Sequence, residues 1–220
     1  MILCTRFFNK NIYQEDFMEK LFAASIVTVT GITLLTRLLL RINMGETLIE
    51  ALVFLTQFFT ILTNTLVLLV MAWIAASRAV SARLMLCVVI SITCVGLIYH
   101  LLLAHLNPLR GLALAADHGV HTAVPCLTVA WWLLWGEKPA LLWKDPLLWI
   151  IWPLAYCSYA LTRAAFSGFY PFPFLDLPSL GSVRLAANLV GMVLVFSIVG
   201  LALTSLGKVT AVARAQSMKP

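Results

Sequence analysis

The sequence has few charged side chains. Asp, Glu, Lys and Arg make up 11% of its 220 residues, whereas they make up about 25% of a typical soluble domain. Such a chain cannot cover a water-facing surface, and with 62% hydrophobic residues it is too apolar to be intrinsically disordered. Cysteine is also scarce, because five residues, an odd number, do not make a disulfide-stapled secreted domain. Of the classes considered, only an integral membrane protein fits this composition.

Further absences narrow the function. The sequence has no glycine-rich phosphate loop and no surface pattern of interleaved basic and aromatic residues, so we expect no nucleic acid partner. Acidic residues are also few, nine against fifteen Lys and Arg, which gives a net charge of +6. In so apolar a chain, membrane topology explains that excess, because cytoplasmic loops are enriched in Lys and Arg.

Long uncharged runs are the main feature that the sequence does contain. A helix needs about 20 mostly apolar residues to cross a bilayer, and six runs approach or exceed that length. We therefore predict an all-α integral membrane bundle of six transmembrane helices over residues 21–207, with a short cytoplasmic N-terminal segment (1–20) and a cytoplasmic tail (208–220). The six runs are Leu21–Thr36, Ala51–Ser77, Leu84–Leu109, His118–Gly136, Pro146–Thr162 and Leu185–Gly207.

The distribution of Lys and Arg predicts the orientation of the bundle. Ten of the fifteen lie in the terminal segments and in loops 77–83 and 137–145, and five lie in the other three loops. The positive-inside rule then places both termini in the cytoplasm, which an even number of spans also requires. All seven Trp lie at or near the helix ends assigned to that face, as is typical of membrane–water interfaces.

Polar side chains gather toward the predicted outer ends of the helices. Because ionisable groups inside a membrane are costly, they usually face a bundle interior or a water-filled cavity. Thr56, Thr60 and Asn64 are spaced i, i+4, i+8 and so share one face of the second predicted helix. We therefore predict a polar pocket that opens toward the outer leaflet. All four His lie at this end, namely His100, His105, His118 and His121.

A hydroxyl beside an imidazole is the minimal arrangement for nucleophilic acyl transfer. Threonine becomes a nucleophile only when a base removes its proton, and neutral imidazole is the usual base. Thr60 and His121 lie at similar depths in the predicted bundle, so the geometry permits a contact. The amides of Gln57 and Asn64 would then be available to donate to a developing oxyanion.

Other uses of these residues are open. Asp117, Asp176 or a backbone carbonyl would orient the imidazole. His118 and His121, at i and i+3, are compatible with a zinc site, but no HExxH motif occurs, and we expect neither metal nor cofactor. Arg163 is expected to snorkel to the interface, or to pair with Asp176 or a substrate carboxylate. A single polar residue in a membrane helix often only hydrogen-bonds a neighbouring helix.

Three motifs, taken in order, resemble those of a known family. They are FTILTN at 59–64, HGVHT at 118–122 followed by VP at 124–125, and YPFPFLD at 170–176. In this combination the chain is similar to the androgen-induced / androgen-dependent tissue-factor-pathway-inhibitor-regulating superfamily, and most of all to its bacterial six-span branch, the Pr-six-Pr-type membrane proteins. The resemblance covers nearly the whole chain.

This resemblance implies a multi-pass hydrolase with a threonine nucleophile and a histidine partner, which fall on Thr60 and His121. Animal members cleave fatty acid esters of hydroxy fatty acids, so the implied substrate is a fatty-acyl ester from the membrane. We therefore expect a lipid ester hydrolase of a bacterial inner membrane, with the 170–176 loop over the site. The supporting residues expected around the pair are Gln57, Asn64, His118, Arg163, Tyr170 and Asp176.

Two other classes of function are compatible with the same sequence. One is a non-catalytic membrane protein that binds a lipid or small molecule, or a transporter. Transporters usually show inverted repeats or broken helices near the midplane, and no repeat is evident here. The other is a structural scaffold, in which the polar residues would only join helices.

Overall fold

The computed structural model describes residues 2–106, 108–138 and 142–217. Every regular element within these ranges is helical, which confirms the all-α prediction. In chain order the elements are α1 (Ile2–Asn43), α2 (Leu48–Leu55), α3 (Phe59–Ala75), α4 (Ala82–Ile98), the π-helical turn η1 (Tyr99–Leu103), α5 (Gly111–His118), the π-helical turn η2 (Gly119–Ala123), α6 (Val124–Trp135), α7 (Asp145–Leu148), α8 (Ile151–Ser167), the 3₁₀ turn η3 (Pro173–Leu175) and α9 (Leu177–Ser217).

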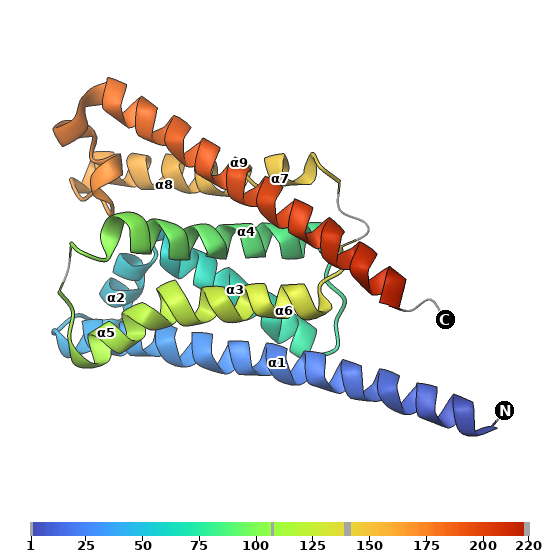
Figure 1. Ribbon diagram of the computed structural model, residues 1–220. Helices are drawn as coiled ribbons and strands as arrows, with labels where there is room; N and C mark the ends of the chain where they lie inside the picture. The colour runs from blue at the N-terminus through green and yellow to red at the C-terminus, as the bar shows by residue number, and fades with distance from the viewer. Residues whose placement is uncertain (1, 107, 139–141, 218–220) are drawn as a thin grey trace.

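The long helices run side by side around a central α4 (Figure 1). α1 packs along α3, and α4 packs against α3, α6 and α9. Within the most apolar window of each helix, 56% of α4 is buried but only 22% of α1 and 22% of α9. The start of α1 and the end of α9 lie at one end of the bundle, while α2, α5 and η3 lie at the other end (Figure 1).

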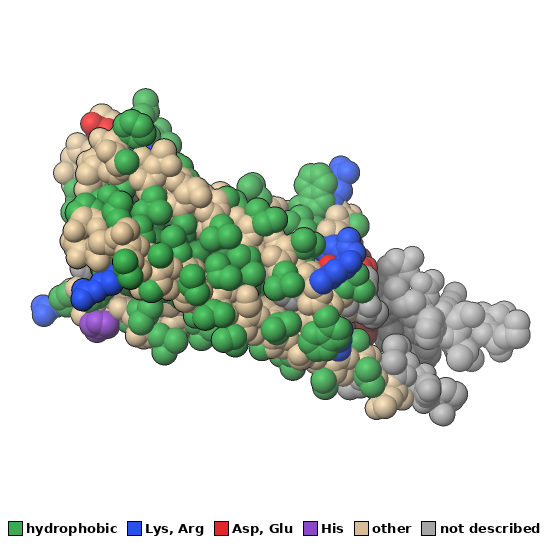
Figure 2. Space-filling model, turned by 90° about the horizontal axis from the view of Figure 1, so that it is seen from above, with side chains coloured by type: hydrophobic (Ala, Val, Ile, Leu, Met, Phe, Trp, Pro, Cys, Tyr) green, Lys and Arg blue, Asp and Glu red, His purple; other side chains and the backbone are tan. Residues whose placement is uncertain are grey.

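The outer surface of the bundle is apolar. Large hydrophobic side chains are exposed on every side, among them Ile32 on α1, Leu69 on α3, Ile151 on α8 and Ile198 on α9. On the face shown in Figure 2, Lys and Arg lie toward the two ends and hydrophobic side chains cover the region between them. A soluble monomer does not expose such a surface, whereas hydrocarbon would cover it without cost.

Three described helical stretches are long and apolar enough to cross a membrane: Gln14–Asn43, Ala82–Leu103 and Leu177–Val212. The bent pair formed by α2 and α3 would make a fourth. These stretches support a membrane protein built of transmembrane helices.

The run over 51–77 is broken, so the prediction of one continuous helix there is wrong. α2 begins with a capping box between Thr47 and Glu50 and ends at Leu55, and α3 leaves it at an angle of 97°. Phe58 has extended backbone angles at the break. The carbonyl of Gln57, freed by the break, accepts a 2.6 Å hydrogen bond from the Tyr156 hydroxyl on α8, which satisfies a group that the bilayer could not.

Other boundaries also differ from the expected ones. α1 begins at Ile2, so the helix includes most of the segment 1–20 that we expected to precede it. α9 continues beyond Gly207 to Ser217 and begins eight residues before Leu185, with a non-helical residue at Gly181 (φ 71°). The fourth run is interrupted by the π turn η2.

The Tyr156 hydrogen bond should stabilise the α2–α3 break. We expect Tyr156→Phe to lower the free energy of unfolding in detergent by roughly 1–3 kcal/mol, because the buried Gln57 carbonyl loses its donor. Thermal unfolding of the purified protein measures the change. Tyr159→Phe is the matched control, since the Tyr159 hydroxyl is exposed and only accepts a bond from Arg163. Equal losses in both variants would contradict this role.

Candidate functional site

The break places Thr60 in the first turn of α3, and this position decides what its hydroxyl can do. Helical Thr28, Thr30 and Thr33 each donate their hydroxyl to the carbonyl four residues earlier, the usual outcome in a membrane helix. Residue 56, four before Thr60, lies outside α3. The buried Thr60 hydroxyl instead lies 3.2 Å from Nε2 of His121, and the predicted contact is confirmed.

His121 is held so that its Nε2 accepts the Thr60 proton. Its Nδ1 lies 3.0 Å from the backbone carbonyl oxygen of Asp117 and 3.3 Å from the Asp117 carboxylate. Both of these groups are acceptors, so in the neutral imidazole the proton lies on Nδ1. The Nε2 lone pair then faces the Thr60 hydroxyl, as a general base requires.

Asp117 is itself held by a cation from another helix. Its carboxylate is buried and accepts a 2.5 Å bond from Nη2 of Arg37 on α1. The guanidinium stabilises the carboxylate in its charged form inside an apolar bundle. The result is a connected series of four side chains, Thr60, His121, Asp117 and Arg37, from α3, η2, α5 and α1.

The two π turns lie next to each other and fix the imidazole from the side. The ring of Tyr99 in η1 stacks on His121 in η2, with centroids 3.9 Å apart and planes 9° apart. The next residues along each turn, His100 and Thr122, make a hydrogen bond of 2.9 Å on the exposed side. π turns are frequent at functional sites, and here they direct one pair inward and the other outward.

Two glycines allow the helices around His121 to approach closely. A Cβ at Gly119 would lie 2.5 Å from Cγ2 of Thr33, and a Cβ at Gly96 would lie 3.0 Å from the His121 carbonyl oxygen. α1 and α4 can therefore pack directly on the η2 backbone.

Asn64 has a different role from the one the sequence suggested. Its side-chain nitrogen donates to the carbonyls of Thr60 (2.8 Å) and Val120 (3.2 Å). Both amide hydrogens are thus used to join α3 to η2, and neither is free to bind an acyl oxygen. Asn64 is a positioning residue rather than an oxyanion donor.

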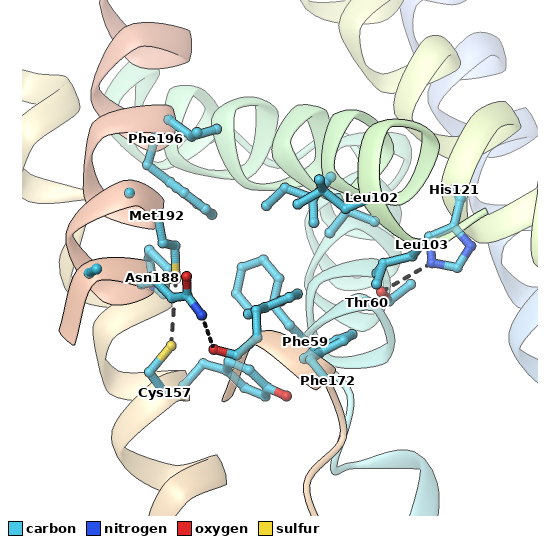
Figure 3. A pocket seen from close by; sticks show the side chains of 18 residues that line it. Phe59, Thr60, Leu102, Leu103, His121, Cys157, Phe172, Asn188, Met192 and Phe196 are labelled. Carbon is cyan, nitrogen blue, oxygen red and sulfur yellow. Dashed lines mark hydrogen bonds between the residues drawn. The ribbon is translucent and has the colours of Figure 1, made fainter. Parts of the chain in front are cut away.

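Two cavities meet at the Thr60–His121 pair. The first, which we call the α9 chamber, has a volume of about 310 Å³ and lies between α3, α4, α8 and α9. In Figure 3 the pair stands on one side of this chamber, opposite Asn188, Met192 and Phe196 of α9.

The second cavity, the α1 chamber, has a volume of about 820 Å³ and extends toward α1, α2 and α5. Its lining includes the charged side chains Arg37, Arg41 and Asp117. Four residues line both chambers, namely Thr60, Leu103, His121 and Phe172.

The remaining predicted site residues lie outside both chambers. Gln57 is buried at the α2–α3 break and contributes its backbone carbonyl to Tyr156. His118 is exposed at the end of α5 and does not share the environment of His121. Arg163 donates to Tyr159, and no ion pair joins it to Asp176, although the structure describes both residues.

The 170–176 loop takes part only through its middle. Pro171, Phe172 and Pro173 line the α1 chamber, while Tyr170 lines neither cavity. Asp176 lies at the start of α9, where its carboxylate accepts bonds from the backbone N–H and the hydroxyl of Ser179. It therefore caps a helix rather than binding substrate.

Sequence reasoning missed Tyr99 and Arg37, and it placed the 170–176 loop over the site without singling out Phe172. Arg37 carried a signal, because an arginine interrupting an apolar run needs a partner, and Asp117 was among the candidates to orient the imidazole. The Tyr99 stack depends on two π turns that no residue spacing indicated.

Among the described residues, no group of three or more His, Cys, Asp or Glu could hold a metal ion. No family model, curated protein or solved structure matches the chain. Inferences about its function therefore rest on the site geometry and on the motifs at 59–64, 118–125 and 170–176.

The close approach at Gly119 predicts a specific sensitivity. Gly119→Ala should lower the free energy of unfolding by about 1–3 kcal/mol, because overpacking displaces η2 from Thr33. Thermal unfolding in detergent measures the loss, and adding Thr33→Ala should recover part of it. Gly191→Ala is the control, since a Cβ there has no heavy atom within 4 Å. A Gly119→Ala protein as stable as the control would refute the packing argument.

Proposed function

We propose that this protein is a multi-pass membrane hydrolase that cleaves fatty-acyl esters, with Thr60 as nucleophile and His121 as general base. The observation that carries the proposal is the 3.2 Å contact between the Thr60 hydroxyl and His121 Nε2 at the junction of two chambers. A purely structural pair would not need an empty cavity on each side. The resemblance to the androgen-induced and Pr-six-Pr-type proteins, which implies the same two residues, supports this reading.

The proposed topology has six spans, formed by α1, the α2–α3 pair, α4 with η1, α5 to α6 with η2, α8 and α9. The start of α1 and the end of α9 share one end of the bundle (Figure 1), and the loops there carry most of the Lys and Arg. We place that end in the cytoplasm of a bacterium. The site then lies toward the extracytoplasmic face, where esters enter from the bilayer and water from outside.

The reaction follows the usual order of acyl transfer. Thr60 Oγ1 attacks the acyl carbon while His121 Nε2 takes its proton, and the tetrahedral intermediate collapses as His121 returns that proton to the leaving alcohol oxygen. Water then enters, gives its proton to His121 and attacks the acyl-threonine. This second step releases the fatty acid and regenerates the Thr60 hydroxyl.

The start of α3 supports the intermediate in place of the Asn64 amide. The first N–H groups of a helix have no partner within it, and here the N–H groups of residues 61 and 62 both bond to the Phe58 carbonyl. For the N–H of Thr60, the described residues show no acceptor. This N–H adjoins the nucleophile at the positive end of the α3 dipole, where negative charge is stabilised.

Two substitutions at residue 60 separate a chemical role from a structural one. Thr60→Val keeps the shape and should abolish turnover of a fatty-acyl ester, and Thr60→Ser keeps the hydroxyl and should retain it. A long-chain alkyl fluorophosphonate should attach to Thr60, as peptide mass spectrometry would show. The control is Thr122→Val, which removes the hydroxyl that bonds the exposed His100 outside both chambers and should leave turnover near that of the unaltered protein.

Turnover that persists in Thr60→Val and His121→Ala would exclude the assigned pair. If the folded protein binds long-chain lipids but hydrolyses no ester in a broad panel and takes no label, it is a lipid-binding protein instead.

The Asp117 carboxylate should matter for rate more than for binding. We expect Asp117→Asn to lower kcat by roughly 10²–10⁴-fold, the range that general acid–base catalysis contributes, with little change in KM. Steady-state kinetics measures both constants. Asp176→Asn removes a carboxylate outside the chambers and should leave kcat nearly unchanged. A similar kcat in the two variants would rule out Asp117 as the group that orients His121.

A further inference from the structure

The two chambers differ in chemistry although they share the reacting pair. In the α9 chamber no lining side chain is charged, and Asn188 is already engaged, because its amide donates to the Phe174 carbonyl at 2.9 Å. The dashed bond in Figure 3 shows that this amide points to the loop. The α9 chamber therefore suits a hydrocarbon chain.

The α1 chamber is also mainly apolar, but its lining includes charged side chains. It is lined by Arg37 and Asp117, which pair with each other, and by Arg41, which pairs with Glu46 and stacks on the ring of Phe54 at 3.6 Å. These charges lie at the end of the bundle that holds α2 and α5 (Figure 1). The α1 chamber therefore offers polar groups to the alcohol half of an ester, which the α9 chamber does not.

The residues that hold His121 lie on one side of the Thr60–His121 pair. Asp117 and Tyr99, which hold His121 from behind and from the side, line the α1 chamber but not the α9 chamber. The leaving oxygen must lie where His121 can protonate it, whereas the acyl carbon stays on Thr60. The leaving alcohol is thus expected on the side where His121 and its partners are exposed.

We propose, on the basis of the function proposed above, that the two halves of the ester occupy separate chambers: the acyl chain lies in the α9 chamber and the alcohol half in the α1 chamber. Phe172, which lines both, separates the two halves at the ester. Gly191 and Ala113 then determine the length that each chamber accepts, Gly191 for the acyl chain and Ala113 for the alcohol.

Gly191 is a suitable position for testing this assignment. It lines the α9 chamber, and a Cβ built there meets no heavy atom within 4 Å. Gly191→Leu therefore adds a side chain to the chamber without a backbone clash. Ala113→Leu makes the equivalent change in the α1 chamber, and Val190→Leu, on the exposed side of α9, controls for enlarging a side chain on that helix.

The test uses two isomeric esters, hexyl palmitate and hexadecyl hexanoate, which contain the same atoms with the long chain on opposite sides of the ester. Gly191→Leu should lower kcat/KM for hexyl palmitate by roughly tenfold or more, since misfit of a single methylene already changes it by about 10–200-fold. It should spare hexadecyl hexanoate. Ala113→Leu should show the reverse pattern, and Val190→Leu should affect neither ester.

A second readout does not depend on turnover. A long-chain alkyl fluorophosphonate with a photoreactive diazirine at the chain end should label Thr60, with loss of fluoride, and then cross-link on illumination to Met192 or Phe196 of α9. Cross-links to Leu40 or Met44, which line the α1 chamber, would overturn the assignment.

The outcomes separate this proposal from the function on which it rests. If Thr60 is labelled and Thr60→Val is inactive, but both isomers respond alike to Gly191→Leu and Ala113→Leu, the chamber assignment is wrong and the hydrolase stands. A reversed pattern exchanges the two chambers and also contradicts the proposal. If the unaltered protein hydrolyses no ester and takes no label at Thr60, the proposed function itself fails.

Discussion

The bend between α2 and α3 is the feature on which the rest of the site depends. A threonine inside a continuous membrane helix donates its hydroxyl to the preceding turn, as Thr30 and Thr33 do here. By ending α2 at Leu55 and starting α3 at Phe59, the chain removes that acceptor from Thr60. The same bend leaves the Thr60 N–H, beside the hydroxyl, with no acceptor among the described residues. One local break therefore directs the Thr60 hydroxyl to His121 and leaves the adjacent N–H unpaired among the described residues.

A break of this kind is costly in a bilayer, because no water can satisfy the freed backbone groups. In this structure, side chains hydrogen-bond the backbone carbonyls near the break. Tyr156 of α8 donates to the Gln57 carbonyl, and Asn64 joins the Thr60 and Val120 carbonyls across α3 and η2. Taken singly, these are ordinary hydrogen bonds of a helix bundle. Together they fix the α2–α3 break and the start of α3, where Thr60 lies.

The sequence predicted the helical class and the concentration of polar residues at one end, because both follow from composition and from where charges interrupt apolar runs. It also predicted the Thr60–His121 contact, since similar depth on neighbouring helices can be counted. It could not predict the break. Residues 56–58 are Thr, Gln and Phe, and none of them is the glycine or proline that usually marks a helix end.

The remaining differences have the same origin. From the sequence, the Asn64 amide is available to bind a substrate. In the structure it donates to the Val120 carbonyl, and this bond depends on the position of η2. His118 and His121 are spaced to share a helix face, but the π turn changes that register and leaves His118 exposed. Asp176 ends the YPFPFLD motif, which suggests a substrate role, yet its carboxylate caps the start of α9 through Ser179. Backbone groups of the fold therefore engage Asn64 and Asp176, whereas His118 lies exposed outside the site.

The placement of charge links the fold to the chemistry. Arg37 and Asp117 are costly within a membrane bundle, and a hydrophobic pair would often be as stable. What the pair adds is orientation, because a buried carboxylate held by Arg37 fixes the Nδ1 proton of His121 and thereby leaves Nε2 free for Thr60. Arg37 and Asp117 line only the α1 chamber, whereas Thr60 and His121 line both chambers. The bundle therefore keeps its charged side chains out of the α9 chamber, and the Thr60–His121 pair lies where the two chambers meet.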